Sequence, residues 1–368
     1  MGLLGLSGCG SPSSASVEMS SQTELVKTGS MELQYAENFA VDYYEDGYKM
    51  LTTLPDSKRY LIVPEGQPVP MGLDEDVSIL QEPLQNIYLV ASGVMDMFAS
   101  VDAVDQIRFS GQKQENWYIQ TAKDAMAAGD MIYAGKYSKP DYELLVSEGC
   151  DLAIENRMIT HSPEVVEMLQ SFDIPVMIEY SSYEQHPLGK VEWVKFFGAL
   201  TGKEAEAEEA FAEQTEILEK VESGEKTGKT IAFFYVTSNG LIQVRQSTDY
   251  IPKLIELAGG RYIFEDLEDS GSGRSTLNMQ VEDFYAGAKD ADILIYNSSI
   301  DGGVTTLDEL IGKCNILKDF KAVQEGQVYC TTNDMYQQSM AIGYLLQDMH
   351  TVLTDDDTAK LRYLFLLQ

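Results

Sequence analysis

Short apolar runs alternate with amphipathic stretches along most of this 368-residue chain. In a first set, strand-like runs at 87–91, 106–109, 131–134, 152–155 and 175–179 surround helix-like stretches at 94–100, 118–128, 142–148 and 163–171. A second set repeats the alternation at 230–235, 250–258, 281–289, 293–296, 327–330 and 340–353. Short strands separated by helices are typical of a parallel, doubly wound sheet. The sequence therefore predicts an α/β fold with two Rossmann-like lobes, each built on a parallel central sheet.

Helix-forming residues dominate the segment 187–222, which lies between the two sets. Ala207, Phe211, Leu218 and Val221 share one face of its second half, as in an amphipathic helix. We expect one long bridging helix that limits hinge motion; the alternative is an ordinary surface helix of a single domain. The predicted N-terminal lobe covers 33–186, with an antiparallel ribbon at its start, and the C-terminal lobe covers 223–368.

Residues 1–32 have the composition of a targeting segment and tether. Leu6-Ser7-Gly8-Cys9 resembles a bacterial lipobox, and a Ser-rich spacer follows it. The apolar run before Cys9 is short and has no basic start, so we expect a clipped signal. Lipidation of Cys9 would anchor the protein to the outer surface of the bacterial cell membrane, an extracytoplasmic location.

The formal net charge is −33, from 59 acidic and 26 basic residues. Such a chain repels phosphate backbones, which excludes nucleic-acid binding as a function class. Besides Cys9 there are three cysteines, Cys150, Cys314 and Cys330, without CxxC spacing, and we expect buried free thiols.

Six motifs occur in an order that resembles a known family. Their sequences begin at Ala134-Gly135, Pro140-Asp141-Tyr-Glu143, Gly149-Cys-Asp151, Tyr250-Ile-Pro, Met279-Gln-Val-Glu282 with Asp290-Ala-Asp292, and Phe320-Lys-Ala-Val323 with Gly326-Gln-Val-Tyr329. The pattern resembles the substrate-binding proteins of ABC importers for iron-siderophore, haem or cobalamin. Cys150 stands where that family has a proline. The resemblance covers about residues 86–353 and implies two lobes, one bridging helix and a ligand between them.

Ligands of open α/β sheets bind beyond the carboxyl ends of the strands. The residues at or near these ends that we expect to bind ligand are Ser92, Arg108, Glu155, Asn156, Arg157, Tyr235, Arg245, Tyr296, Asn297 and Tyr336. Trp117 and Tyr137 join them as rings that could stack on a flat scaffold. The chain has only seven arginines, and three of them near a cleft would suit an anionic ligand. The alternative for each arginine is a salt bridge to one of the many acids.

The resemblance implies a ferric siderophore as the ligand, with haem or a corrinoid as the alternative. It also implies that Glu143 and Glu282, one on each lobe, dock into arginine pockets of an ABC permease; the alternative is that both are acids favoured at helix N-termini. We expect a monomer without a cofactor. Direct iron ligation by Tyr137, His161, His186 or Tyr336 is a weaker alternative, because a chelated iron needs no protein ligand.

Other function classes find less support in the sequence. The glycine-rich stretch 271–276 follows an acidic run and not a strand, so it lacks the context of a phosphate loop, and no hydrolase or protease motif occurs. We therefore expect no enzyme. A zinc- or manganese-binding protein would need His161, His186 and an acid to converge. A surface adhesion or signalling protein that kept this fold is a further alternative.

Overall fold

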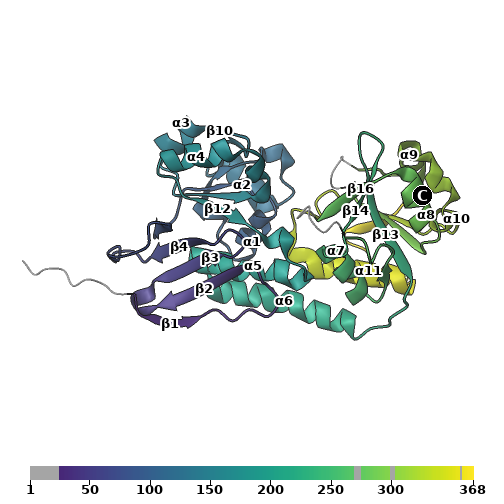
Figure 1. Ribbon diagram of the computed structural model, residues 1–368, viewed down its shortest axis with the longest axis horizontal. Helices are drawn as coiled ribbons and strands as arrows, with labels where there is room; N and C mark the ends of the chain where they lie inside the picture. The colour runs from purple at the N-terminus through teal and green to yellow at the C-terminus, as the bar shows by residue number, and fades with distance from the viewer. Residues whose placement is uncertain (1–24, 269–274, 299–302, 357–358) are drawn as a thin grey trace, which may run out of the picture.

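Two α/β lobes lie side by side over a helix that runs beneath both of them (Figure 1). The computed structural model describes residues 25–268, 275–298, 303–356 and 359–368. Within that part of the chain, no helix is both long and apolar enough to cross a membrane. The two-lobed α/β architecture predicted from the alternation of strands and helices is confirmed.

A five-stranded sheet precedes the first lobe. Its strands, in spatial order, are β1 (Lys27–Ser30), β2 (Phe39–Tyr44), β3 (Lys49–Thr53), β4 (Lys58–Val63) and β5 (Val77–Gln81). Neighbours are antiparallel except β4 and β5, so the predicted antiparallel ribbon is longer and partly parallel. The ring of Phe39 packs edge-on against Trp193 at 4.9 Å and Phe196 at 5.3 Å, which fixes this sheet to the core.

The central sheet of the N-terminal lobe is entirely parallel. Its spatial order is β12 (Val176–Glu179), β11 (Leu152–Asn156), β6 (Ile87–Leu89), β7 (Ile107–Ser110) and β8 (Ile132–Tyr133). The helices are α1 (Val94–Ser100), α2 (Gln120–Ala128), α3 (Tyr142–Ser147) and α4 (Pro163–Ser171), and β9 (Gly135–Lys136) pairs with β10 (Lys139–Pro140). The first strand of this sheet along the chain, β6, lies in its middle. The next strands, β7 and β8, are added on one side of β6, and β11 and β12 are then added on the other side. The switch point between β6 and β11 is where such folds bind ligands.

The C-terminal lobe has a parallel core with antiparallel edges. Parallel strands β15 (Arg261–Tyr262), β13 (Thr230–Val236), β17 (Ile293–Tyr296) and β18 (Val328–Thr331) form the core. The antiparallel strands are β14 (Ile242–Arg245), β16 (Thr276–Met279) and β19 (Leu364–Leu366). The helices are α7 (Tyr250–Leu257), α8 (Val281–Ala288), α9 (Leu307–Lys313), α10 (Lys321–Gln324) and α11 (Ile342–Thr354). The parallel core agrees with the predicted parallel central sheet, and the antiparallel strands are added outside it.

The segment predicted as one bridging helix is two helices, α5 (Pro187–Thr201) and α6 (Glu204–Glu222). Gly202 ends α5 in the left-handed region, at φ 72°, a conformation that glycine adopts at little cost. The two helices then pack against each other so closely that a Cβ on Gly198 would lie 2.5 Å from the Cβ of Ala207. The prediction of a single helix over 187–222 is therefore wrong at its middle.

The two helices have different positions in the molecule. Nearly every residue of α5 is buried, because its sequence is mostly apolar and it lies inside the N-terminal half. The helix that joins the lobes is α6, which runs along the base of both in Figure 1. Near the middle of α6, Gln214 Oε1 accepts a hydrogen bond from the backbone N–H of Gly343 at 3.0 Å. This bond fixes α6 to α11 of the C-terminal lobe.

Candidate functional site

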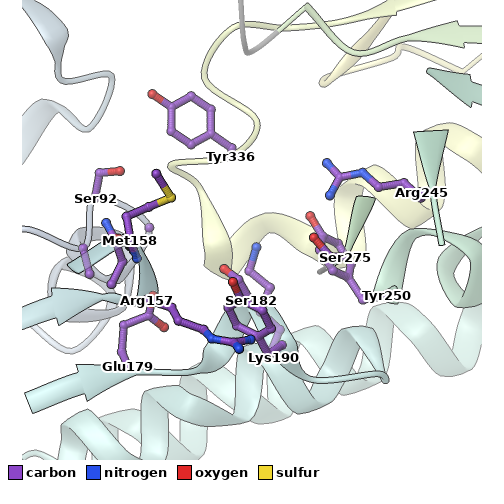
Figure 2. A pocket seen from close by; sticks show the side chains of 14 residues that line it. Ser92, Arg157, Met158, Glu179, Ser182, Lys190, Arg245, Tyr250, Ser275 and Tyr336 are labelled. Atoms are coloured by element: carbon purple, nitrogen blue, oxygen red, sulfur yellow. Dashed lines mark hydrogen bonds between the residues drawn. The ribbon is translucent and has the colours of Figure 1, made fainter. Parts of the chain in front are cut away.

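A cleft of about 280 Å³ lies between the lobes. Its walls come from both lobes and its floor from α5 (Figure 2). The lining residues are Ala91, Ser92, Gly93, Asn156, Arg157, Met158, Glu179, Ser182, Tyr183, Lys190, Arg245, Tyr250, Ser275 and Tyr336. Because Ser92 follows β6 and Asn156 ends β11, the cleft opens at the switch point of the N-terminal sheet.

The N-terminal wall is made by the loops after three neighbouring strands. Asn156 begins the 3-10 helix Arg157–His161, and its Oδ1 accepts the backbone N–H of Met158 at 2.8 Å. The guanidinium of Arg157 lies over the ring of Tyr183, 4.6 Å from its centroid. Tyr183 itself follows β12. The cap and the stacked ring thus position Arg157 at the cleft.

The C-terminal wall centres on Arg245 at the end of β14. Tyr262 holds its backbone on both sides: the hydroxyl donates to the Arg245 carbonyl at 2.8 Å and accepts from its N–H at 3.1 Å. The guanidinium donates to Asp249 at 3.4 Å, and Asp249 caps α7 by accepting the N–H of Ile251 at 2.9 Å. Arg245 is therefore fixed in direction, with its head facing the cleft (Figure 2).

The floor carries a lysine, Lys190, on the first turn of α5. Its side chain is 6% exposed, and its ammonium lies 4.7 Å from the ring centroid of Tyr250, the first residue of α7. Lys190 therefore contacts the C-terminal lobe from a helix that belongs to the N-terminal half.

A segment of the C-terminal lobe crosses to the N-terminal lobe at the edge of the cleft. The side chain of Gln337 donates to the Asn116 carbonyl at 2.8 Å and accepts the N–H of Tyr118 at 2.9 Å. Asp96 of α1 accepts the N–H of Met340 at 2.7 Å. We call residues 332–341 the crossing segment. It carries Tyr336, which is 39% exposed and lines the cleft, so this tyrosine is held against the N-terminal lobe.

Three cations and a few buried acids set the charge of the cleft. Arg157, Lys190 and Arg245 all line it. Burial raises the pKa of Glu179, although its carboxylate accepts the N–H of Ser181 at 2.8 Å and the hydroxyl at 2.5 Å. Burial likewise raises the pKa of Asp249 against the lowering effect of Arg245. Among the described residues that line the cleft, Glu179 is the one acid against these three cations, so the cleft favours a negatively charged ligand.

Five of the residues expected to bind ligand line this cleft. They are Ser92, Asn156, Arg157, Arg245 and Tyr336. Their role in binding stays a prediction, but the structure brings them together from both lobes.

Three other candidates of the N-terminal lobe lie outside the cleft. Arg108 donates to Glu148 at 3.0 Å and to the carbonyls of Gly129 and Asp130, which is the salt-bridge alternative. Trp117 is 1% exposed, with its indole N–H on Ser110. Tyr137 is half-buried and packs against a hydrophobic cluster of the N-terminal lobe.

Glu155 also lies outside the cleft, because alternate residues of a strand face opposite sides of the sheet. Asn156 faces the cleft, whereas Glu155 is fully buried near Tyr88 and Tyr142. Burial raises the pKa of the Glu155 carboxyl well above its usual range. The expected role of Glu155 in ligand binding needs an accessible carboxylate, but this side chain is fully buried and does not line the cleft.

Three candidates of the C-terminal lobe belong to its core. Tyr296 is fully buried, and the half-buried Tyr235 packs against it with ring centroids 6.2 Å apart. Asn297 is buried, and its N–H donates to the carbonyl of Phe234 at 2.8 Å. The rings of Tyr235 and Tyr296 belong to the core of the lobe, and none of the three residues lines the cleft.

The remaining sequence predictions concern other surfaces. Glu143 and Glu282 are exposed in the first turns of α3 and α8, one on each lobe. Cys9 and most of the glycine-rich stretch 271–276 lie outside the described residues. Cys150, Cys314 and Cys330 are free thiols as predicted, with Cys150 only half-buried.

No cluster of three or more metal-ligating side chains occurs among the residues that the structure describes. His186 caps α5 through Nδ1, which accepts the N–H of Leu188 at 3.2 Å, and stacks on Tyr35 at 4.4 Å. His161 is exposed at the end of a 3-10 helix. The convergence that a zinc or manganese site requires is therefore not found in this part of the chain.

Strand ends alone did not reveal the whole site. Ser182 and Tyr183 follow β12 and obey the strand-end rule that we applied to its neighbours. Lys190 and Tyr250 lie in the first turns of helices, which that rule does not reach. The sequence feature that could have predicted the floor of the cleft is a lysine inside the largely apolar sequence of α5.

The two lobes and the cleft between them define a two-lobed solute-binding protein. A family model described as periplasmic binding protein matches residues 90–335, which span most of both lobes. The chain belongs to the periplasmic binding protein family, and the resemblance found in the motifs is confirmed.

Known proteins agree with this assignment. An uncharacterized lipoprotein of Methanocaldococcus jannaschii is 24% identical over 353 residues, covering 87% of this chain and 81% of the relative. A periplasmic heme binding protein from Pseudomonas aeruginosa has a TM-score of 0.59 at 13% identity, covering 77% of this chain and 98% of that chain. A protein of the ABC-type Fe3+-hydroxamate transport system from Saccharomonospora viridis has a TM-score of 0.56 at 16% identity, covering 73% and 93%. These neighbours share the fold, and membership of the periplasmic binding protein family indicates an extracytoplasmic location.

Proposed function

We propose that this protein is an extracytoplasmic lipoprotein that captures a ferric siderophore-type complex between its lobes and delivers it to an ABC permease. The observation that carries the proposal is the cleft itself, which places Arg157 and Arg245 on opposite walls with Tyr183, Tyr250 and Tyr336 around them. Cations hold the acidic donor groups of a chelate, and tyrosine rings pack against its organic scaffold. The protein would act by binding alone and not as an enzyme.

The structural neighbours from a heme binding protein and from an Fe3+-hydroxamate transport system support iron complexes as the ligand class. Haem or a corrinoid is the second candidate, because the same walls could hold a flat macrocycle. A free zinc or manganese ion is a poorer fit, because the residues that line the cleft include no histidine and no cysteine.

Delivery would use Glu143 and Glu282, whose exposed carboxylates could orient the lobes on a permease that carries complementary arginines. A lipid on Cys9 would keep the protein, as a monomer, near that permease.

A thermal-shift panel tests the proposal. The purified protein is incubated with ferric hydroxamates, ferric catecholates, ferric citrate, haem, cobalamin and the free ions Zn²⁺, Mn²⁺ and Fe³⁺. A ligand at 100 times its dissociation constant stabilises the folded state by about 2.7 kcal/mol, which is expected for an iron chelate. A shift with haem or cobalamin alone would select the second candidate. Stabilisation by a free ion alone, or by nothing in the panel, would refute the proposal.

A further inference from the structure

Lys190 is a buried cation whose partners within the protein are incomplete. Across the described residues, its ammonium forms no hydrogen bond and has no carboxylate within 4.0 Å, and it lies over the Tyr250 ring. An ammonium has three N–H donors, and a cation–π contact replaces none of the hydrogen bonds that they lose on leaving water. The side chain nevertheless lines the cleft, and Figure 2 shows it rising from α5 toward Ser182 and Tyr250.

The acids that feel the charge of Lys190 are bound to other groups. Glu179, Asp249 and Asp96 each interact with it over a longer distance. Glu179 accepts from Ser181, Asp249 accepts from Ile251 and Arg245, and Asp96 accepts from Met340. None of the three approaches Lys190 closely enough to form an ion pair. The ammonium is thus attracted to its surroundings but not hydrogen-bonded by them.

From this arrangement, and on the basis of the function proposed above, we infer that Lys190 determines ligand specificity by binding an anionic group of the chelate. The carboxylate, catecholate or other oxyanion that enters the floor accepts the hydrogen bonds that the protein leaves unfilled. Arg157 and Arg245 then meet further acidic groups from the two walls. The cleft volume of about 280 Å³ is at the small end of the range for ligand sites, and suits a small chelate or one acidic arm of a larger one.

The same geometry rejects other chelates. A neutral or cationic complex would displace solvent from Lys190 without supplying an acceptor, and it would leave a buried charge unpaired. The ligand class is therefore a polyanionic iron complex, and neutral trihydroxamates and cationic complexes are disfavoured.

A comparison of chelates of different charge tests the inference on the wild-type protein. Dissociation constants are measured by calorimetry for ferric citrate and haem as anionic probes, ferrichrome as a neutral probe and ferrioxamine B as a cationic probe. At least one anionic probe should bind 10-fold or more tightly than the neutral and cationic probes. Equal or tighter binding of ferrichrome or ferrioxamine B would overturn the inference and leave the proposed function standing. If no chelate of any charge binds, the proposed function fails and the inference falls with it.

Variants then assign the effect to Lys190. Lys190→Met should weaken the anionic probe by about 10–100-fold, the value of a charge-assisted hydrogen bond, and should reduce the discrimination against ferrichrome. Lys190→Arg should retain part of the affinity, because it keeps the charge. The matched control is Lys289→Met, which removes an ammonium 5.7 Å from the Tyr285 ring on α8, away from the cleft. Equal affinities for Lys190→Met and Lys289→Met would overturn the role of Lys190.

Discussion

The crossing segment offers a direct test of how the cleft is held in shape. Gln337 is fully buried and forms two hydrogen bonds with the N-terminal lobe, to the Asn116 carbonyl and from the Tyr118 N–H. Gln337→Ala removes both of these hydrogen bonds. A buried group left without its partner costs about 1–3 kcal/mol. Because Asn116 and Tyr118 are exposed residues that water can reach, we expect a total loss of about 1–3 kcal/mol rather than twice that amount. The neighbouring Tyr336 should lose its fixed position, and ligand affinity should fall several-fold.

Urea unfolding followed by tryptophan fluorescence measures the loss. The chain has only two tryptophans, and Trp117 lies between the two backbone groups that Gln337 contacts, so the signal reports on this joint. Hydrogen exchange of the Tyr118 amide should accelerate in the same variant. Gln170→Ala, at an exposed position of α4, is the control and should stay within about 0.5 kcal/mol of wild type. An unfolding midpoint and an exchange rate equal to those of the control would refute the reasoning.

Three further predictions concern buried and exposed acids. Glu192→Gln should lower the free energy of unfolding by about 2–4 kcal/mol, because the buried carboxylate accepts three successive backbone N–H groups at 2.8–3.1 Å; urea unfolding checks this against the exposed control Glu209→Gln. Burial raises the pKa of Asp96 to about 6, so between the unfolded and folded pKa values the folded state holds a proton that the unfolded state has lost, and stability relative to Asp96→Asn should fall by about 2 kcal/mol from pH 4 to pH 6. A difference between these two proteins that does not change with pH would contradict that assignment. Glu143→Arg combined with Glu282→Arg should abolish uptake by a reconstituted importer at unchanged ligand affinity, and a loss of affinity would argue against docking.

The strands and helices of both lobes could be predicted because their periodicity is local. Helices α1 and α4 begin and end at the predicted residues. In each case the apolar face and the flanking strands together determine where the helix begins and ends. The bridge could not be predicted as two helices from helix propensity alone. A single glycine such as Gly202 lowers the summed helix propensity of the segment only slightly. The close approach of Gly198 to Ala207 is what shows that the chain turns back there.

The site was predictable where it follows the sheet and not elsewhere. Asn156 and Arg157 were found because the loop after a parallel strand must lie at the carboxyl edge. Glu155, one residue earlier, faces the opposite side of the same strand, and the sequence does not state where a strand's last paired residue lies. Lys190 was not predicted as a site residue, because the floor of the cleft belongs to a helix. The burial of that helix depends on packing between segments that are distant in sequence.

The net charge of the whole chain is negative, whereas the side chains that line the cleft are mostly cationic. The two therefore act on an anionic ligand in opposite directions. A net charge of −33 repels an anionic chelate at long range, although at physiological ionic strength such a field decays over about 8 Å. Attraction therefore begins only when the chelate has reached the cleft, where Arg157, Lys190 and Arg245 face it across little solvent. Long-range steering cannot supply specificity under these conditions. The discrimination between chelates must come from short hydrogen bonds, and Lys190 is the buried cation of the cleft that lacks them within the described protein.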